Sequence, residues 1–224
     1  MKASVQIMDT ISFKPDRNQL GECLKLYPGH RSWERVEKLL LEAEAVARPK
    51  ALYLPTLVET RCSEGIRLQG LWLSSKILSA QSQGADTIFP FLATAGLELE
   101  KWAQQHTALF DRYIAELISE MACQCAVEAV FHKIDSLYEL TNPSCMNPGS
   151  LRDWSIEEQV LLFNLMNGQE RVIGVVLTDE YMMIPMKTMS GIRFSAETQF
   201  VNCDLCQRQI CNYRRAVDIQ NYSR

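Results

Sequence analysis

The chain has 224 residues, enough to bury a sizeable hydrophobic core, and we expect a single domain over residues 1–224. Hydrophobic residues make up 47% and charged residues 22%, which is typical of a globular protein and argues against a disordered chain. The net charge of −4 and the lack of a long apolar run argue against nucleic-acid binding and against a membrane span. The N-terminus turns polar too early for a secretory signal, so we expect a cytoplasmic protein.

The first half of the chain predicts strands that alternate with short helices. A helix is expected from Ser32, because apolar residues recur at helical spacing until Pro49 stops it. Another helical segment follows Gly96. The stretch 51–58 contains Pro55 and therefore suits an edge strand, and Gly70 suggests a bulge within the stretch 66–73. The strands expected in this half are 1–13, 51–58, 66–73 and 87–94.

The second half predicts the longest regular element and one pair of strands. Apolar residues recur at helical spacing from about 108 to 137, which indicates one long helix. Residues 141–154 read as a loop, and Ser155 is placed to cap a further helix. We expect 172–177 to pair antiparallel with 186–194, because the bend between them is too short for a parallel crossover. Together these elements predict a fold that mixes α and β structure.

Three cysteines near the C-terminus, within a Cys-rich segment at about 200–215, form the most informative motif. Cys203, Cys206 and Cys211 are spaced C-x2-C-x4-C, and the first two can converge on one metal ion. Basic residues just behind Cys211 favour the thiolate form that metals bind. Two other interpretations remain open. The thiols are either small buried hydrophobes or members of a disulfide, and a reducing compartment disfavours the disulfide.

The remaining chemistry-bearing residues do not form a recognisable catalytic set. Cys123 and Cys125 lie two positions apart on the predicted long helix, point in different directions and are interpreted as packing residues. No serine–histidine–aspartate set, phosphate-binding glycine loop or carboxylate pair at catalytic spacing is present. His30 and His106 have no nearby acidic or thiol partner in sequence, and His132 is interpreted as a surface or core residue of the predicted long helix, so none of the three is assigned a role.

The stretch 148–215 contains a series of short motifs: Pro148-Gly149 with Trp154 and Glu158-Gln159, then Gly174-Val-Val-Leu177-Thr178, Met183-Ile-Pro185, Ser190-Gly191 and Asn212-Tyr213-Arg214-Arg215. This series resembles the activation domain of cobalamin-dependent methionine synthase, in which the corresponding motifs occur in the same order. Weaker similarity extends upstream to 91–100 and 111–113, so that about half of the chain is covered.

The resemblance implies an α+β fold in which an antiparallel sheet is flanked by helices, with one long central helix. It also implies a role in reactivating a corrinoid cofactor whose cobalt has been oxidised to the inactive divalent state. Domains of this family present S-adenosylmethionine to that cobalt, while an outside protein supplies the electron. The implied partners are a corrinoid-binding protein or methyltransferase and an electron-donor protein.

Two positions depart from the family's arginine-x-x-proline-glycine-tyrosine loop. Cys145 replaces the arginine and Ser150 replaces the tyrosine. A thiol cannot grip a carboxylate with the two parallel hydrogen bonds of a guanidinium. By resemblance, the positions expected to bind S-adenosylmethionine are Pro148, Gly149, Arg152 as a substitute for the lost arginine, and Phe200 at a family tyrosine.

The same departure suggests a fourth metal ligand. In the family's fold the tail that carries Cys203, Cys206 and Cys211 passes near the loop that carries Cys145. We therefore expect these four cysteines to form one site for an iron–sulfur cluster or for zinc, with their sulfurs within about 7 Å of one another. A cluster would deliver electrons, whereas zinc would only fasten the tail.

Three functions follow from these observations. The first is reductive activation of a corrinoid cofactor on a partner protein. The second is a docking or chaperone-like module for a corrinoid protein, without chemistry and with a structural zinc site. The third, an unrelated small-molecule enzyme, lacks any supporting motif. The sequence does not decide between enzyme and accessory protein.

Overall fold

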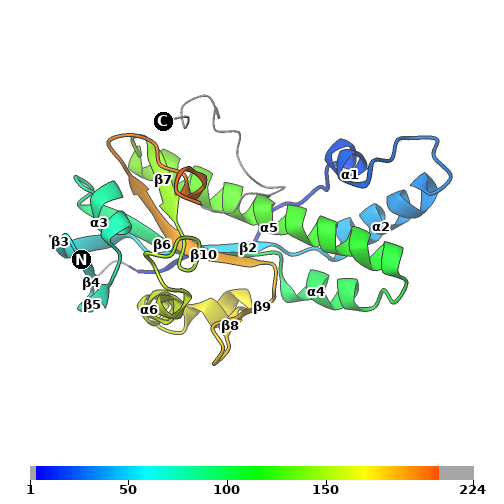
Figure 1. Ribbon diagram of the computed structural model, residues 1–224. Coiled ribbons are helices and arrows are strands. Elements are labelled where there is room, and N and C mark those ends of the chain that lie inside the picture. The colour runs from blue at the N-terminus through cyan, green and yellow to red at the C-terminus, as the bar shows by residue number, and fades with distance from the viewer. Residues whose placement is uncertain (1–3, 207–224) are drawn as a thin grey trace.

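The computed structural model describes residues 4–206 and contains an eight-stranded sheet in which every described pairing is antiparallel (Figure 1). The strands follow the order β1-β2-β6-β3-β4-β5, and β10 pairs with the other edge of β6 and with β7. Their bounds are β1 (Gln6–Met8), β2 (Lys50–Tyr53), β3 (Thr56–Cys62), β4 (Gly65–Leu68), β5 (Leu71–Leu73), β6 (Thr87–Thr94), β7 (Pro143–Met146) and β10 (Thr188–Ser195).

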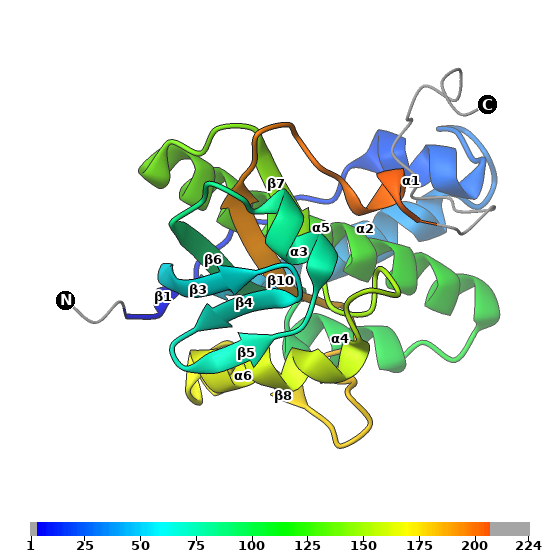
Figure 2. The same cartoon turned by 60° about the vertical axis from the view of Figure 1, so that its left-hand side comes forward.

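Helices cover both faces of this sheet (Figures 1 and 2). The 30-residue helix α5 runs along one face, and α6 covers the other together with the small ribbon of β8 (Val176–Leu177) and β9 (Met183–Ile184). None of the described helices combines the length and hydropathy that a membrane span needs. The helices are α1 (Arg17–Leu24), α2 (Trp33–Val46), α3 (Lys76–Gln81), α4 (Leu97–Gln104), α5 (Leu109–Tyr138), α6 (Gln159–Met166) and the 3-10 turns η1 (Ile156–Glu158), η2 (Gln169–Ile173) and η3 (Asn202–Asp204).

Strand β6 is the centre of the sheet, because its side chains are buried on both faces. Phe91 and Ala93 pack with residues of α5, while Leu92 belongs to the cluster on the α6 side. Alternation of side chains along a strand places neighbours on opposite faces, so a strand between two helical layers must be apolar throughout. This explains the continuous apolar run at 87–94 and confirms the expected buried strand.

The expected helices at 32–48, after Gly96 and at 108–137 are confirmed, but the pairing of 172–177 with 186–194 is wrong. Residues Gln169–Ile173 instead form η2, between Gly168 and Gly174, which both have positive φ. Only β8 pairs with β9, and β10 pairs with β6 over six positions. Strand β10 is largely buried between β6 and β7. Burial of its apolar side chains there stabilises the fold more than pairing in an exposed two-stranded ribbon would.

Two further expectations about strands need correction. The stretch 51–58 is two strands, since the chain leaves the ladder at Pro55, and β2 is internal because it pairs with both β1 and β6. The stretch 66–73 is a hairpin of β4 and β5. Its turn residues Gln69 and Gly70 both have positive φ, which the tight turn of an antiparallel hairpin requires. Gly70 therefore marks a turn and not a bulge.

Candidate functional site

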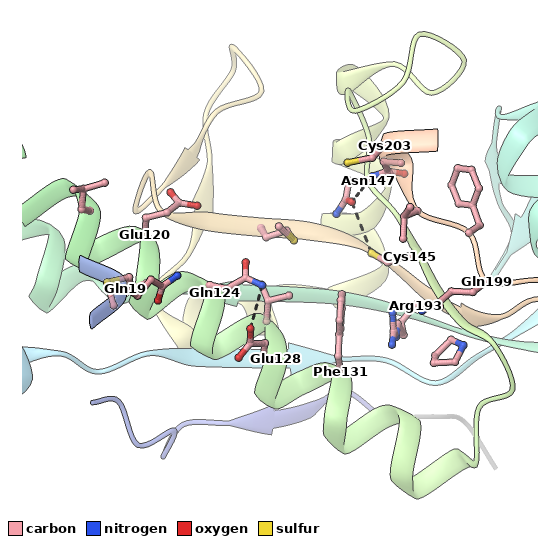
Figure 3. Close-up of a pocket in the computed structure, with 18 of the residues that line it drawn as sticks. Gln19, Glu120, Gln124, Glu128, Phe131, Cys145, Asn147, Arg193, Gln199 and Cys203 are labelled. Carbon is pink, nitrogen blue, oxygen red and sulfur yellow. Dashed lines mark hydrogen bonds between the residues drawn. The ribbon is translucent and has the colours of Figure 1, made fainter. Parts of the chain in front are cut away.

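A pocket of about 640 Å³ lies between α5, the β7–β10 edge of the sheet and residues 199–203 (Figure 3). Helix α1 contributes Gln19, Leu20 and Cys23 to its wall. The pocket therefore gathers segments that are far apart in the sequence, as a ligand site in a folded domain commonly does.

The strand register determines which side chains reach this pocket. Residues Met189 and Arg193 of β10 lie on the α5 face and line the pocket, whereas Ile192 and Phe194 face the α6 side. In the ladder between β10 and β7, Arg193 is the direct partner of Cys145. Directly opposed residues of an antiparallel pair project from the same face. A guanidinium thus stands beside Cys145, where the resemblance predicts an arginine, but it comes from the neighbouring strand.

The Arg193 guanidinium is held by groups of α5. Its Nε and Nη2 donate to the two carboxylate oxygens of Asp135 at 2.9 and 2.5 Å, and its Cζ lies 4.2 Å from the centre of the Phe131 ring. The Arg193 side chain is only 11% exposed. Since a bidentate carboxylate already occupies the fork, Arg193 is not available to grip a second carboxylate in the same way.

Asn147 connects three parts of the pocket wall. Its Nδ2 donates to the carbonyl oxygen of Ser190 at 2.6 Å, and its Oδ1 accepts from Asn202 Nδ2 at 2.9 Å. The thiol of Cys145 also approaches Asn147 Oδ1, at 3.7 Å. Figure 3 shows Asn147, Cys145 and Cys203 gathered at one end of the pocket. This amide therefore fixes the start of η3 against β7 and β10.

Helix α5 presents a polar stripe to the pocket. Glu120, Gln124 and Glu128 are spaced four residues apart, which places them on one face of a helix. Glu120 forms an ion pair with Lys187 at 3.1 Å, and Gln124 Nε2 donates to Glu128 at 3.5 Å. The charged groups of this wall therefore have partners within the protein.

The structure brings only part of the expected cofactor-binding set to the pocket. Phe200 lines it, is 6% exposed and donates its backbone N–H to Ser144 Oγ at 2.8 Å. Pro148, Gly149 and Arg152 are not among the described residues that line the pocket. Pro148 is buried, whereas Gly149 and Arg152 are exposed.

The segment after Gly149 has a structural role instead. Glu158 accepts from the backbone N–H of Ser74 and from the indole N–H of the fully buried Trp154, both at 2.9 Å. Asp153 accepts from Ser75 Oγ at 2.5 Å and from the N–H of Ile77 at 2.9 Å, at the start of α3. The tryptophan and glutamate of the family pattern thus fasten this loop to α3, and Asp153 is engaged there.

The four cysteines proposed as metal ligands are only partly described. Cys145 and Cys203 both line the pocket, and Cys206 is half-buried three residues beyond Cys203. Cys211 lies outside the described residues. Within residues 4–206, no group of three or more histidine, cysteine, aspartate or glutamate side chains is arranged to hold a metal ion. The four-cysteine site therefore stays a prediction that depends on Cys211.

The two cysteines of α5 are packing residues, as expected. Burial raises the pKa of the Cys123 thiol to about 12, with a smaller contribution from Glu120, so this thiol is neutral at physiological pH. Cys125 packs at the border of the cluster between α5, α2 and α4, and burial raises the pKa of its thiol as well. A buried neutral thiol is a poor metal ligand and a poor nucleophile.

Sequence reasoning missed the α5 wall and Arg193. The four-residue spacing of Glu120, Gln124 and Glu128 was visible in the sequence as a row of polar residues on one face of the predicted long helix. Arg193 interrupts an apolar strand, which also signals a special position. Neither signal identifies a pocket, because only the tertiary structure sets this stripe opposite β10.

These observations define an α+β protein with an antiparallel sheet, one long helix across it, and a pocket between that helix and the sheet edge. A crystal structure of the MetH reactivation domain bound to AdoHcy has this fold. The two superpose with a TM-score of 0.65 at 15% sequence identity, over 89% of this chain and 81% of that chain. The match confirms the resemblance in fold to the methionine synthase activation domain. No family model and no curated protein matches the chain.

The geometry supports an expectation of weak or absent binding of S-adenosylmethionine. Cys145 and Ser150 replace the family's arginine and tyrosine, Arg152 lies outside the pocket wall, and Asp135 occupies the fork of Arg193. We expect a dissociation constant weaker than roughly 100 μM, because none of the described residues that line the pocket offers an open guanidinium fork to the ligand carboxylate. Calorimetry under reducing conditions measures it, and binding in the low micromolar range would contradict the expectation.

Proposed function

We propose that this protein activates or reactivates a corrinoid cofactor carried by a partner methyltransferase or corrinoid protein. The observation that supports the proposal most is the fold shared with the MetH reactivation domain over 89% of the chain. The pocket adds support, because it is lined by Cys145, the position at which the resemblance implies the family's ligand-binding arginine.

The reaction proposed is rescue of inactive divalent cobalt. One electron from an outside donor protein reduces Co(II) to Co(I). If S-adenosylmethionine is the methyl source, Co(I) then takes its methyl group, which gives methyl–Co(III) and releases the neutral thioether. The contribution proposed for the chain itself is to hold the reactants: Phe131, Asn147 and Arg193 line the pocket, and hydrogen bonds to Asp135 and to the Ser190 carbonyl hold Arg193 and Asn147 in place to orient a ligand. An iron–sulfur cluster, if Cys145, Cys203, Cys206 and Cys211 bind one, would supply electrons.

A second candidate is a docking or chaperone-like module for a corrinoid protein. The outer face of the β8–β9 ribbon favours it. Val176 and Ile184 are direct ladder partners and are 44% and 40% exposed, and Met182 is 52% exposed. An apolar outer face on a surface ribbon is characteristic of protein contacts. This candidate needs no electron transfer and is compatible with a zinc ion on the cysteines.

Reactivation is tested under anaerobic conditions with a purified corrinoid protein of the same organism, loaded with Co(II) cobalamin. With a chemical reductant, and with S-adenosylmethionine either present or absent, the protein should accelerate loss of the Co(II) absorption at substoichiometric amounts. A stable complex without any spectral change would support the docking module instead. Neither binding nor spectral change with any corrinoid protein would overturn both candidates.

The metal proposal makes a separate prediction. If the four cysteines share one metal, replacing Cys145 with serine should lower the metal content of anaerobically purified protein several-fold, since a tetrahedral or cubane site then loses one of four thiolates. Iron, sulfide and zinc analysis measures it, with Cys62→Ser, an exposed cysteine on β3, as the control. Unchanged metal content in the Cys145→Ser variant would remove Cys145 from the site.

A further inference from the structure

Two cysteines stand one turn apart in the segment that forms one side of the pocket. Cys203 lies in η3, and Cys206 follows three positions later. The backbone N–H of Cys206 donates to the carbonyl oxygen of Cys203 at 3.4 Å, so the pair spans a single 3-10 turn. Residues three positions apart in such a turn project from the same side, with their Cα atoms about 6 Å apart. A disulfide joins residues whose Cα atoms are about 4.4–6.8 Å apart, so the backbone already holds this pair at a suitable separation.

Hydrogen bonds hold this turn in place. Asn202, the residue before Cys203, donates from its Nδ2 to Asn147 Oδ1 at 2.9 Å. The carboxylate of Asp204 accepts from the backbone N–H of Val201 at 3.3 Å, at the start of the same turn. These contacts order the backbone before the two sulfurs are joined. Closing a disulfide here therefore costs less conformational entropy than it would in an unstructured chain.

The thiol of Cys203 is reached through the pocket. Cys203 and Cys206 are both half-buried, and Cys203 lines the cavity of about 640 Å³. A cavity of this size admits a small molecule, whereas the disulfide of a folded protein would not fit inside it. Cys23 is exposed and lines the same pocket, but no cysteine lies three or four positions from it in the sequence. The Cys203–Cys206 pair differs from Cys23, because a second thiol one turn away can displace a group attached to the first.

We propose that Cys203 and Cys206 form a redox-active dithiol that exchanges with a low-molecular-weight disulfide in the pocket. The thiolate of Cys203, its proton lost to water, attacks one sulfur of the small disulfide, whose S–S bond breaks, and half of that molecule leaves as a thiolate that takes up a proton. The thiolate of Cys206 then attacks the Cys203 sulfur and releases the second half in the same way. Overall the two cysteines lose two electrons and two protons, and the small disulfide becomes two thiols.

This exchange is independent of the reactivation of a corrinoid. It does depend on whether a metal ion occupies the same sulfurs, since a thiolate bound to a metal is not available to attack a disulfide. Metal binding and thiol–disulfide exchange at Cys203 and Cys206 therefore exclude each other at any one moment, and the test is run both with and without a chelator.

The test equilibrates the full chain, purified anaerobically and reduced, with mixtures of reduced and oxidised glutathione. Remaining thiols are alkylated, and the chain is digested with trypsin. Trypsin cuts after Arg193 and Arg208, so both cysteines of the pair fall in the peptide 194–208, whereas Cys145 and Cys211 fall in other peptides. We expect the chelated sample to carry an internal disulfide in the peptide 194–208, seen as the loss of two hydrogen masses and reversed by dithiothreitol.

Single variants identify the order of the two steps. Cys206→Ser should leave glutathione attached to Cys203, because the thiol that displaces it is missing. Cys203→Ser should lose the internal disulfide and most of the glutathione on this peptide, since Cys203 is the thiol that lines the pocket. Cys23→Ser is the matched control, because it removes another thiol of the pocket wall and should leave the internal disulfide unchanged.

Three results would overturn the inference. The first is a peptide 194–208 that stays reduced in the presence of the chelator while Cys23 takes up glutathione. The second is a cross-link from this peptide to the peptide of Cys145 or of Cys211 in place of the internal disulfide. The third concerns the turn itself: the equilibrium constant for forming the disulfide should be at least about fivefold larger in the folded chain than in urea, as expected from hydrogen bonds that hold the turn. Equal constants would show that the fold does not prepare this pair.

Discussion

Replacing Gly191 with alanine is expected to lower the free energy of unfolding by about 3 kcal/mol or more, the upper range for overpacking a core. A Cβ atom at Gly191 would lie 2.5 Å from Asn147 Nδ2, 2.6 Å from the carbonyl oxygen of Met146 and 3.0 Å from the Phe91 ring. The carbonyl belongs to the adjoining strand β7, so it cannot move without disturbing the pairing of β7 with β10. Urea denaturation of the wild-type and variant proteins measures the change.

A second variant identifies the source of that destabilisation. Adding Asn147→Ala to Gly191→Ala removes the contact with the amide but leaves the contact with the Met146 carbonyl. We therefore expect little recovery of stability in the double variant. Full recovery would show that the side chain of Asn147, and not the close approach of the two strands, makes glycine necessary at this position.

Replacing Asp135 with asparagine should destabilise the protein by about 2 kcal/mol. The Arg193 guanidinium, which is largely buried, would then lack its bidentate carboxylate partner. The estimate is reduced from that of a fully buried pair, since the Asp135 side chain is 26% exposed. The melting temperature should fall by several degrees for a chain of this length. Thermal unfolding followed by circular dichroism measures it.

The matched control for this variant is an exposed pair. Lys76 and Glu64 are 3.2 Å apart, with side chains 66% and 61% exposed, and Glu64→Gln should change stability by less than about 0.5 kcal/mol. Equal effects of Asp135→Asn and Glu64→Gln would mean that burial does not strengthen the Arg193 pair.

Much of the fold was predictable because the relevant signals are local. The apolar spacing from 108 to 137 predicted α5, and the unbroken apolar run at 87–94 predicted a strand buried on both faces, as β6 is. Ser75 and Ser155 cap the segments that follow them, as serine before an apolar run commonly does. Periodicity and capping act within one or two turns of chain, so they can be read without the tertiary structure.

Strand pairing was predicted less well, because it depends on competition between distant segments. The short bend at 181–185 favoured a hairpin between its two flanks, yet β10 pairs with β6 and β7. The sequence does not show which edge of β6 is left for β10. In the structure, β2 and β3 pair along one edge of β6, and the opposite edge is left for β10. A ladder inside the core buries more apolar surface than a surface ribbon does, and this difference decides the pairing.

The sequence by itself determined the α+β class, the long helix and the similarity in fold to the methionine synthase activation domain. It also identified Cys145 as a departure at the ligand loop. The tertiary structure alone decided that Arg193 stands opposite Cys145 and that Asp135 holds it. It alone brought side chains of α1, α5, the β7–β10 edge and residues 199–203 to one pocket. Contacts of this kind join residues many positions apart, and only packing of the helix on the sheet determines them.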